Sequence, residues 1–191
     1  NCATATMASS GAFLRSLRTL VDSQGGTGKP IHVTEWNIGL GQSCGNEFFA
    51  EQRTQSFASG VLTLMQDPAL NIDAAHFYAG VPIMSLFDFT STAGKAKINP
   101  FAWAFWAHTR LRGAERLSAR VCQGAACVDG HAAENLSLQA LAAKSGIGQA
   151  VIVTNDSTST QTFTLNASGL TDAAVNITIS TPPAGVAEVN A

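Results

Sequence analysis

The order of helix-like and strand-like segments constrains the fold of this chain more than any other feature of its sequence. Helix-like apolar spacing recurs at about residues 10–25, 47–67 and 100–112, and the strand-like runs 31–36 and 72–78 stand between them. Alternating helices and strands predict parallel strands that are joined by right-handed crossovers. The pattern therefore predicts α/β structure in residues 1–112, with too few strands to close an eight-stranded barrel.

Beyond Gly113 the pattern changes to short alternating strands that are separated by Gly, Ser, Asp and Asn. The expected strands are residues 136–142, 149–155, 161–166 and 175–180. In the last of these, aliphatic residues alternate with polar ones, which is typical of a half-buried sheet. We therefore expect residues 113–191 to form a β-sandwich.

One carboxylate, Glu35, stands near the C-terminal end of the first strand-like run, between Thr34 and Trp36. In an extended strand alternate side chains share a face. This predicts one face made of Ile31, Val33 and Glu35, and another face made of His32, Thr34 and Trp36. A carboxylate at a strand tip beside an aromatic ring suggests glycosidase chemistry, and the alternative is a solvated strand end or a partner for an arginine.

Several short motifs together resemble the C-terminal part of a retaining clan-A glycoside hydrolase, closest to families 39 and 51. They are Thr34-Glu35-Trp36, His76-Phe77-Tyr78, Leu86-Phe87-Asp88-Phe89, an aromatic helix at 100–112 and the strands that follow. The resemblance extends from about residue 10 to residue 179 and implies the C-terminal portion of a (β/α)8 barrel in 1–112. The side domain would be the β-sandwich of 113–191.

In enzymes of this kind the glutamate at the end of the seventh barrel strand is the nucleophile, and this position matches Glu35. Their acid/base stands on the fourth strand, usually in an Asn-Glu pair. The pair Asn46-Glu47 follows Glu35 too closely, and it has an ordinary explanation as the start of a helix. We therefore expect the acid/base to come from the N-terminal portion of the same enzyme, and the chain to be inactive and prone to aggregate without it.

The second strand-like run contributes His76 and Tyr78, which should share a face opposite Phe77. The resemblance implies that Tyr78 contacts sugar or orients the nucleophile, and the alternative is a core aromatic residue with its hydroxyl satisfied. His76 is a candidate on the same face. His32 should face the surrounding helices and is interpreted as structural.

Three further residues are candidates for substrate binding. Trp36 would stack on a sugar or pack under a loop, and Asn37 would bind a sugar hydroxyl or form a turn. Asp88, between two phenylalanines in an expected loop, needs a polar partner and would bind a hydroxyl or cap the loop.

The four cysteines are an even number, which favours disulfides and a secreted, extracellular protein. Cys122 and Cys127 are interpreted as a local disulfide that closes a hairpin, which leaves Cys2 to pair with Cys44. Histidines 108 and 131 have no metal-ligand spacing with cysteine or acidic residues, so no metal or other cofactor is expected.

Composition points to a neutral partner. Charged residues make up 13% of the chain against roughly 25% in an average protein. With a net charge of −2, we expect no binding to nucleic acid or to an anionic membrane. The sequence has no apolar run of about 18 residues, so no membrane span is expected. Four Asn-X-Ser/Thr triplets begin at Asn135, Asn155, Asn166 and Asn176, and these are compatible with glycosylation or with chance.

Three functions remain open at this point. The first is a retaining glycoside hydrolase that acts on a polysaccharide or oligosaccharide through Glu35. The second is a non-catalytic carbohydrate-binding protein, and the third is a structural domain without a sugar site.

Overall fold

A computed structural model of the chain describes residues 7–36, 51–78, 86–92, 95–98, 100–145, 148–155, 157 and 160–166. For residues 51–54, 88–92, 95–97, 100 and 145 it describes the backbone only.

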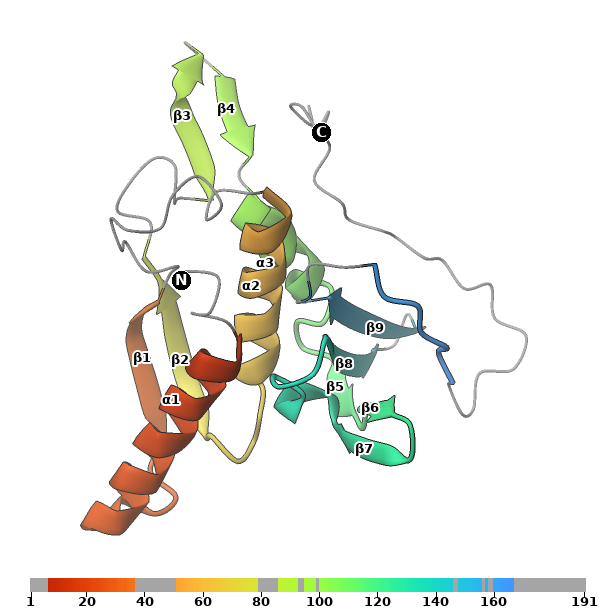
Figure 1. Cartoon of the computed structure of the whole chain (residues 1–191). Helices are drawn as coiled ribbons and strands as arrows, with labels where there is room; N and C mark the ends of the chain where they lie inside the picture. Colours follow the sequence, from red (N-terminus) through yellow and green to blue (C-terminus); the bar gives the residue numbers. More distant parts are fainter. Residues whose placement is uncertain are drawn as a thin grey trace.

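The first half of the chain alternates helices and strands, as its sequence predicts. The elements are α1 (Met7–Val21), β1 (Ile31–Trp36), α2 (Glu51–Leu64), β2 (Ile72–Phe77) and α3 (Pro100–Thr109). β1 and β2 are parallel neighbours in a two-stranded sheet. Figure 1 shows this strand pair beside α1 and α2, with α3 beside α2.

Helix α1 forms because its buried residues recur at helical spacing. Met7, Gly11, Leu14 and Arg18 are buried, which is the i, i+4, i+7 pattern of a helix with one face against a core. The helix passes into a π-helical turn, η2 (Asp22–Gly26), in which Gly25 has a φ of 81°. Since this left-handed conformation favours glycine, the chain leaves the helix here, close to the expected end.

The core lies between the helices and one face of the β1–β2 sheet. One cluster of buried residues comes from α1, from α2 and from the turn that follows α2: Met7, Leu14, Val61, Leu64, Met65 and Leu70. Val33, Ile72 and Ala75 of the sheet pack against this cluster. A second cluster joins α2 to α3 through Ala58, Phe101 and Ala104, with Trp36 and Phe77 packed against it. The helices thus cover one face of the parallel strands.

Residues 87–98 contain a hairpin where a loop was expected. β3 (Phe87–Thr92) pairs in antiparallel fashion with β4 (Lys95–Ile98), and Asp88 lies opposite Lys97. The expectation of a loop was wrong because Phe87 and Phe89 alternate with polar residues, as in a strand. Threonine is also a good strand residue.

The second half is made of antiparallel strands. β5 (Glu115–Leu117), β8 (Leu138–Ser145) and β9 (Gly148–Asn155) form a sheet in the order β5-β8-β9. A short 3₁₀ turn, η5 (Gly130–Ala132), precedes β8. The strand expected at 149–155 is confirmed, and the one expected at 136–142 begins at 138 and continues to 145.

Two other expected strands have different outcomes. Residues 161–166 are not a strand, and Phe163 and Leu165 are about half exposed. Alternation of polar and apolar residues does not by itself provide a neighbour for pairing. Residues 175–180 lie outside the described part of the chain, so the β-sandwich stays a prediction.

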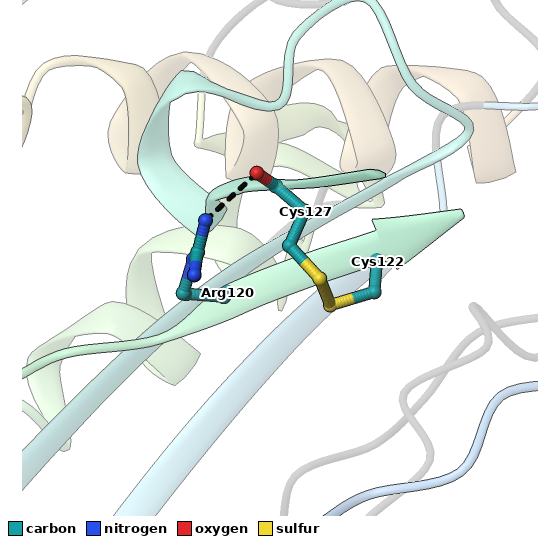
Figure 2. Close-up of a disulfide and its surroundings, with 3 residues drawn as sticks. All are labelled: Arg120, Cys122 and Cys127. Atoms are coloured by element: carbon teal, nitrogen blue, oxygen red, sulfur yellow. Dashed lines mark hydrogen bonds between the residues drawn. A yellow bond between two sulfur atoms is a disulfide. The ribbon is translucent and has the colours of Figure 1, made fainter. Parts of the chain in front are cut away.

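The expected disulfide between Cys122 and Cys127 is present. It joins β6 (Arg120–Gln123) to β7 (Ala126–Asp129), and the two cysteines lie directly opposite each other in this hairpin. Gly124 has a φ of 63° in the tight connection, a conformation that favours glycine. Figure 2 shows Arg120 donating from Nη2 to the Cys127 carbonyl at 2.8 Å. Cys2 and Cys44 lie outside the described residues.

Candidate functional site

The exposed face of the β1–β2 sheet carries a group of polar side chains, which we call the polar strand face. It consists of His32, Thr34, Glu35, Asp73 and His76, all of them exposed. The helices pack on the opposite face of the same two strands. The candidate nucleophile therefore lies on the side of the sheet that the helices leave open.

The direction of these side chains differs from simple alternation. Ile31 is buried and Val33 and Trp36 pack against the helices, while Thr34 and Glu35 are both exposed. The predicted common face of Ile31, Val33 and Glu35 is therefore not observed.

Irregular strand pairing explains this difference. Val33 lies opposite Ala75 and Trp36 lies opposite Phe77, so β1 has one residue more than β2 over this step. An extra residue in one strand exchanges the faces of the side chains that follow it. Trp36 thus returns to the helix side, and Glu35 stays on the open side.

A second irregularity acts on β2. Ile31 lies opposite Ile72 and His32 lies opposite Ala74, so here β2 has the extra residue. His32 and Glu35 are three residues apart in β1, and Asp73 and His76 are three residues apart in β2. Each strand thus carries a polar pair at a spacing that strict alternation would place on opposite faces, and both members of each pair are exposed.

His32 and Asp73 contact each other across the two strands. His32 Nε2 lies 3.1 Å from Asp73 Oδ2, and both side chains are more than half exposed. An exposed pair of this kind contributes less than about 1 kcal/mol to stability. The expectation that His32 faces the helices was wrong, and Asp73 was not predicted as part of this face. The three-residue spacing of polar residues in both strands was the feature of the sequence that could have indicated this group.

At the end of β2, His76 and Tyr78 are exposed and Phe77 faces the core, which is the alternation that the sequence predicts. Phe77 packs in the aromatic core, with ring centroids 5.0 Å from Phe101 and 5.3 Å from Phe105. His76 is exposed, and Tyr78, just beyond the strand, is 47% exposed. The Tyr78 N–H donates to the Trp36 carbonyl at 3.0 Å, which fixes this end of β2 to the end of β1.

Trp36 lies among other rings. Its indole stacks on Phe105 with centroids 5.7 Å apart and planes 22° apart, and it meets Phe77 edge-on at 5.2 Å. This position favours packing over sugar stacking for Trp36.

Other candidates are placed only in part. For Asp88 the structure describes only the backbone, which lies in β3. Asn37 and Glu47 lie outside the described residues. The structure therefore places Glu35 and His76 on the same open face as His32 and Asp73, with Tyr78 just beyond the end of β2.

Away from this face, a buried charge network connects the two halves of the chain. Arg15 of α1 donates from Nε to Glu134 at 2.8 Å and from Nη1 to Asp67 at 2.9 Å. Both carboxylates are almost fully buried, and Glu134 passes over α1 at Gly11, where a Cβ would lie 2.6 Å from Glu134 Cγ. The hydrogen bond to Glu134 is the main cause that raises the pKa of Arg15.

The side chains of His131 and Arg116 flank this network. His131 Nε2 lies 3.4 Å from Asp67 Oδ1, and Arg116 contacts both His131 and the Gln66 carbonyl. Burial, followed by repulsion from Arg116, lowers the pKa of His131. These contacts could not be predicted from the sequence, because Arg15 and Glu134 are 119 residues apart.

A second polar junction connects α2 to both α3 and β9. Ser59 Oγ lies 2.7 Å from Thr154 Oγ1 and 3.3 Å from His108 Nε2. Burial lowers the pKa of His108 to about 4, and a hydrogen bond with Ser59 opposes this in part. His108 is therefore neutral at physiological pH and has a structural position between the helices.

The described residues contain no group of three His, Cys, Asp or Glu side chains that could hold a metal ion. In the same part of the chain, none of the helices is both long and apolar enough to cross a membrane. Comparisons with protein-family models, with curated proteins and with solved structures found no match for this chain.

Proposed function

We propose that this chain is part of a secreted retaining glycoside hydrolase that acts on a polysaccharide or oligosaccharide, with Glu35 as its nucleophile. The observation that carries the proposal is the polar strand face, which lies on two parallel strands whose other face is covered by helices. In an α/β barrel the helices pack outside, and the opposite face of the strands lines the interior. Glu35 near the C-terminal end of β1 would then stand at the barrel mouth.

Retaining hydrolysis needs a second carboxyl group about 5–5.5 Å from the nucleophile. Asp73 is on the same face, but it pairs with His32, which is three residues before Glu35, or about 10 Å along the strand. Asp73 is thus placed to hold His32 and not to protonate a leaving group beside Glu35. We assign the acid/base to another segment of the same enzyme.

The side of the sheet next to α1 supports the need for such a segment. Within the described residues β1 pairs with β2 alone, so no strand in that part of the chain covers its outer edge. Phe13 and Leu20 of α1 are 66% and 57% exposed, and at seven residues apart they share one helix face. A further strand and helix of the barrel would cover this edge and this apolar face.

Covalent trapping tests the proposal. The complete enzyme, or this chain combined with its partner segment, is incubated with activated 2-fluoro sugars, and the labelled peptide is identified by mass spectrometry. We expect a glycosyl adduct on Glu35 and none in Glu35→Gln. Asp73→Asn is the matched control on the same face and should still form the adduct.

The outcomes separate the alternatives. An adduct on another carboxylate would refute the role of Glu35, and turnover by this chain alone would refute the need for a second segment. Binding of oligosaccharide without any adduct would favour a non-catalytic carbohydrate-binding protein.

A further inference from the structure

The Asn-Leu-Ser triplet at Asn135 lies in an exposed β-turn between η5 and β8. The Leu136 N–H donates to the Ala133 carbonyl at 2.9 Å, which places Asn135 at the third position of the turn. Asn135 and Ser137 are exposed, whereas Ala133 and Glu134 are buried. The turn thus fixes the backbone on one side and presents the asparagine and the serine to solvent.

The triplet that begins at Asn155 has a different environment, although it belongs to the same sheet. Asn155 is half-buried at the end of β9, opposite Leu138 of β8. Its Oδ1 accepts hydrogen bonds from the Ser157 N–H at 3.0 Å and from the Ser157 hydroxyl at 2.7 Å. These hydrogen bonds hold the Asn155 side chain and the Ser157 hydroxyl against each other at the end of β9, so this triplet is less accessible than the one at Asn135.

The disulfide of the neighbouring hairpin supplies an independent argument about the compartment. Disulfides such as Cys122–Cys127 form and persist in oxidising environments such as the secretory pathway. N-linked glycans are attached to Asn-X-Ser/Thr triplets in that pathway and end on the protein surface. A chain that forms this disulfide therefore meets the conditions under which Asn135 can be modified.

We propose that Asn135 is an N-glycosylation site and that Asn155 is not occupied in the folded protein. In the modification, the Asn135 amide nitrogen forms a bond to the anomeric carbon of a lipid-pyrophosphate-linked oligosaccharide. The bond from that carbon to the pyrophosphate oxygen breaks, and the amide nitrogen loses a proton. The proposal does not depend on the role assigned to Glu35.

The sequence allows both sites to be resolved by proteolysis. Tryptic cleavage after Arg120 and Lys144 yields residues 121–144, which contain Asn135 as their one triplet together with both cysteines of the hairpin. Asn155 falls in the peptide that follows, and chymotryptic cleavage after Phe163 separates it from the later triplets. The disulfide and the glycan are thus read from one peptide, and the disulfide marks chains in which the hairpin has formed.

The experiment expresses the whole chain behind a secretion signal in a eukaryotic host and maps these peptides before and after enzymatic release of N-glycans. Microsomal protein is used together with secreted protein, so poor secretion does not prevent the measurement. In disulfide-containing chains we expect a glycan on Asn135 that is lost in Asn135→Gln and in Ser137→Ala. Ser157→Ala is the matched control and should leave the pattern unchanged.

Two results would overturn the proposal. The first is an unmodified Asn135 in peptides 121–144 that contain the disulfide. The second is occupancy of Asn155 in those chains, which would show that burial and hydrogen bonding in this structure do not select between the two sites.

Discussion

Acid should weaken the junction between α2, α3 and β9 through a single imidazole, that of His108. Its pKa is about 4, compared with an ordinary value of 6.5, because burial disfavours the charged form. The unfolded chain therefore binds more protons than the folded chain between these two values. The contribution of the neutral His108 imidazole to the free energy of unfolding is present above about pH 6.5 and is lost as the pH falls toward 4.

The size of the loss follows from the shift. A difference of about 2.5 pKa units corresponds to about 3.4 kcal/mol below pH 4. At pH 5 the imidazole would be almost fully protonated in the unfolded chain and mostly neutral in the folded one, which corresponds to about 2 kcal/mol. His131, whose pKa is also lowered, acts in the same direction, so His108 must be isolated by mutation.

The change that isolates it is His108→Gln, because a glutamine amide can donate to Ser59 Oγ from a similar position and does not titrate. Unfolding in urea is followed by the fluorescence of the three tryptophans at pH 8 and pH 5. We expect the wild-type chain to lose about 2 kcal/mol more than the variant between the two pH values.

Ser59→Ala provides the matched control. It removes the hydroxyl that contacts both His108 and Thr154, so stability should fall at both pH values. The imidazole stays buried in this variant, so the acid-dependent loss should remain. If His108→Gln and the wild-type chain lost equal stability between pH 8 and pH 5, the reasoning about burial would be refuted.

Three other changes test the packing. Glu134→Gln should lower the free energy of unfolding by about 2 kcal/mol because it leaves Arg15 with one buried anionic partner; no change in a urea titration would contradict a structural role for the network. Gly60→Ala should destabilise by about 1–2 kcal/mol, since its Cβ would lie 2.6 Å from Gln139 Oε1; a rise in melting temperature would show that the helix–sheet contact is looser. Replacing both cysteines of the hairpin by serine should cost about 2 kcal/mol of stability, and the loss should vanish when the wild-type chain is compared under reducing conditions.

Local periodicity was enough to predict the elements of the first half. The apolar spacing in α1 and α2 and the β-branched run of β1 are properties of a few neighbouring residues, and each segment adopts the structure that its pattern favours. The parallel pairing of β1 and β2 followed from the helix between them.

The faces of the strands could not be predicted in the same way. Alternation gives the direction of a side chain only where both strands advance together, and the pairing of β1 with β2 slips twice. Glu35 was therefore assigned to the face of Ile31, and His32 to the helices. The presence of polar residues in these strands was readable, but their grouping depended on pairing geometry.

The long-range polar contacts could not be predicted from the sequence for a different reason. The contacts of Arg15 with Glu134 and of Ser59 with Thr154 join residues that are far apart in the chain. No local pattern marks such partners, because they become neighbours only when the β5-β8-β9 sheet packs near α2.

The two slips in the pairing of β1 and β2 compensate each other: six residues in one strand end up level with six in the other. Deleting one residue before Glu35 in β1 would restore regular alternation and keep the Glu35 carboxylate on the open face, but the end of β1 would then fall one residue short of the end of β2. A matching deletion in β2 would bring the strand ends level again with the same side chains on each face. A change in the length of one strand should therefore be accepted most readily together with an equal change in the other.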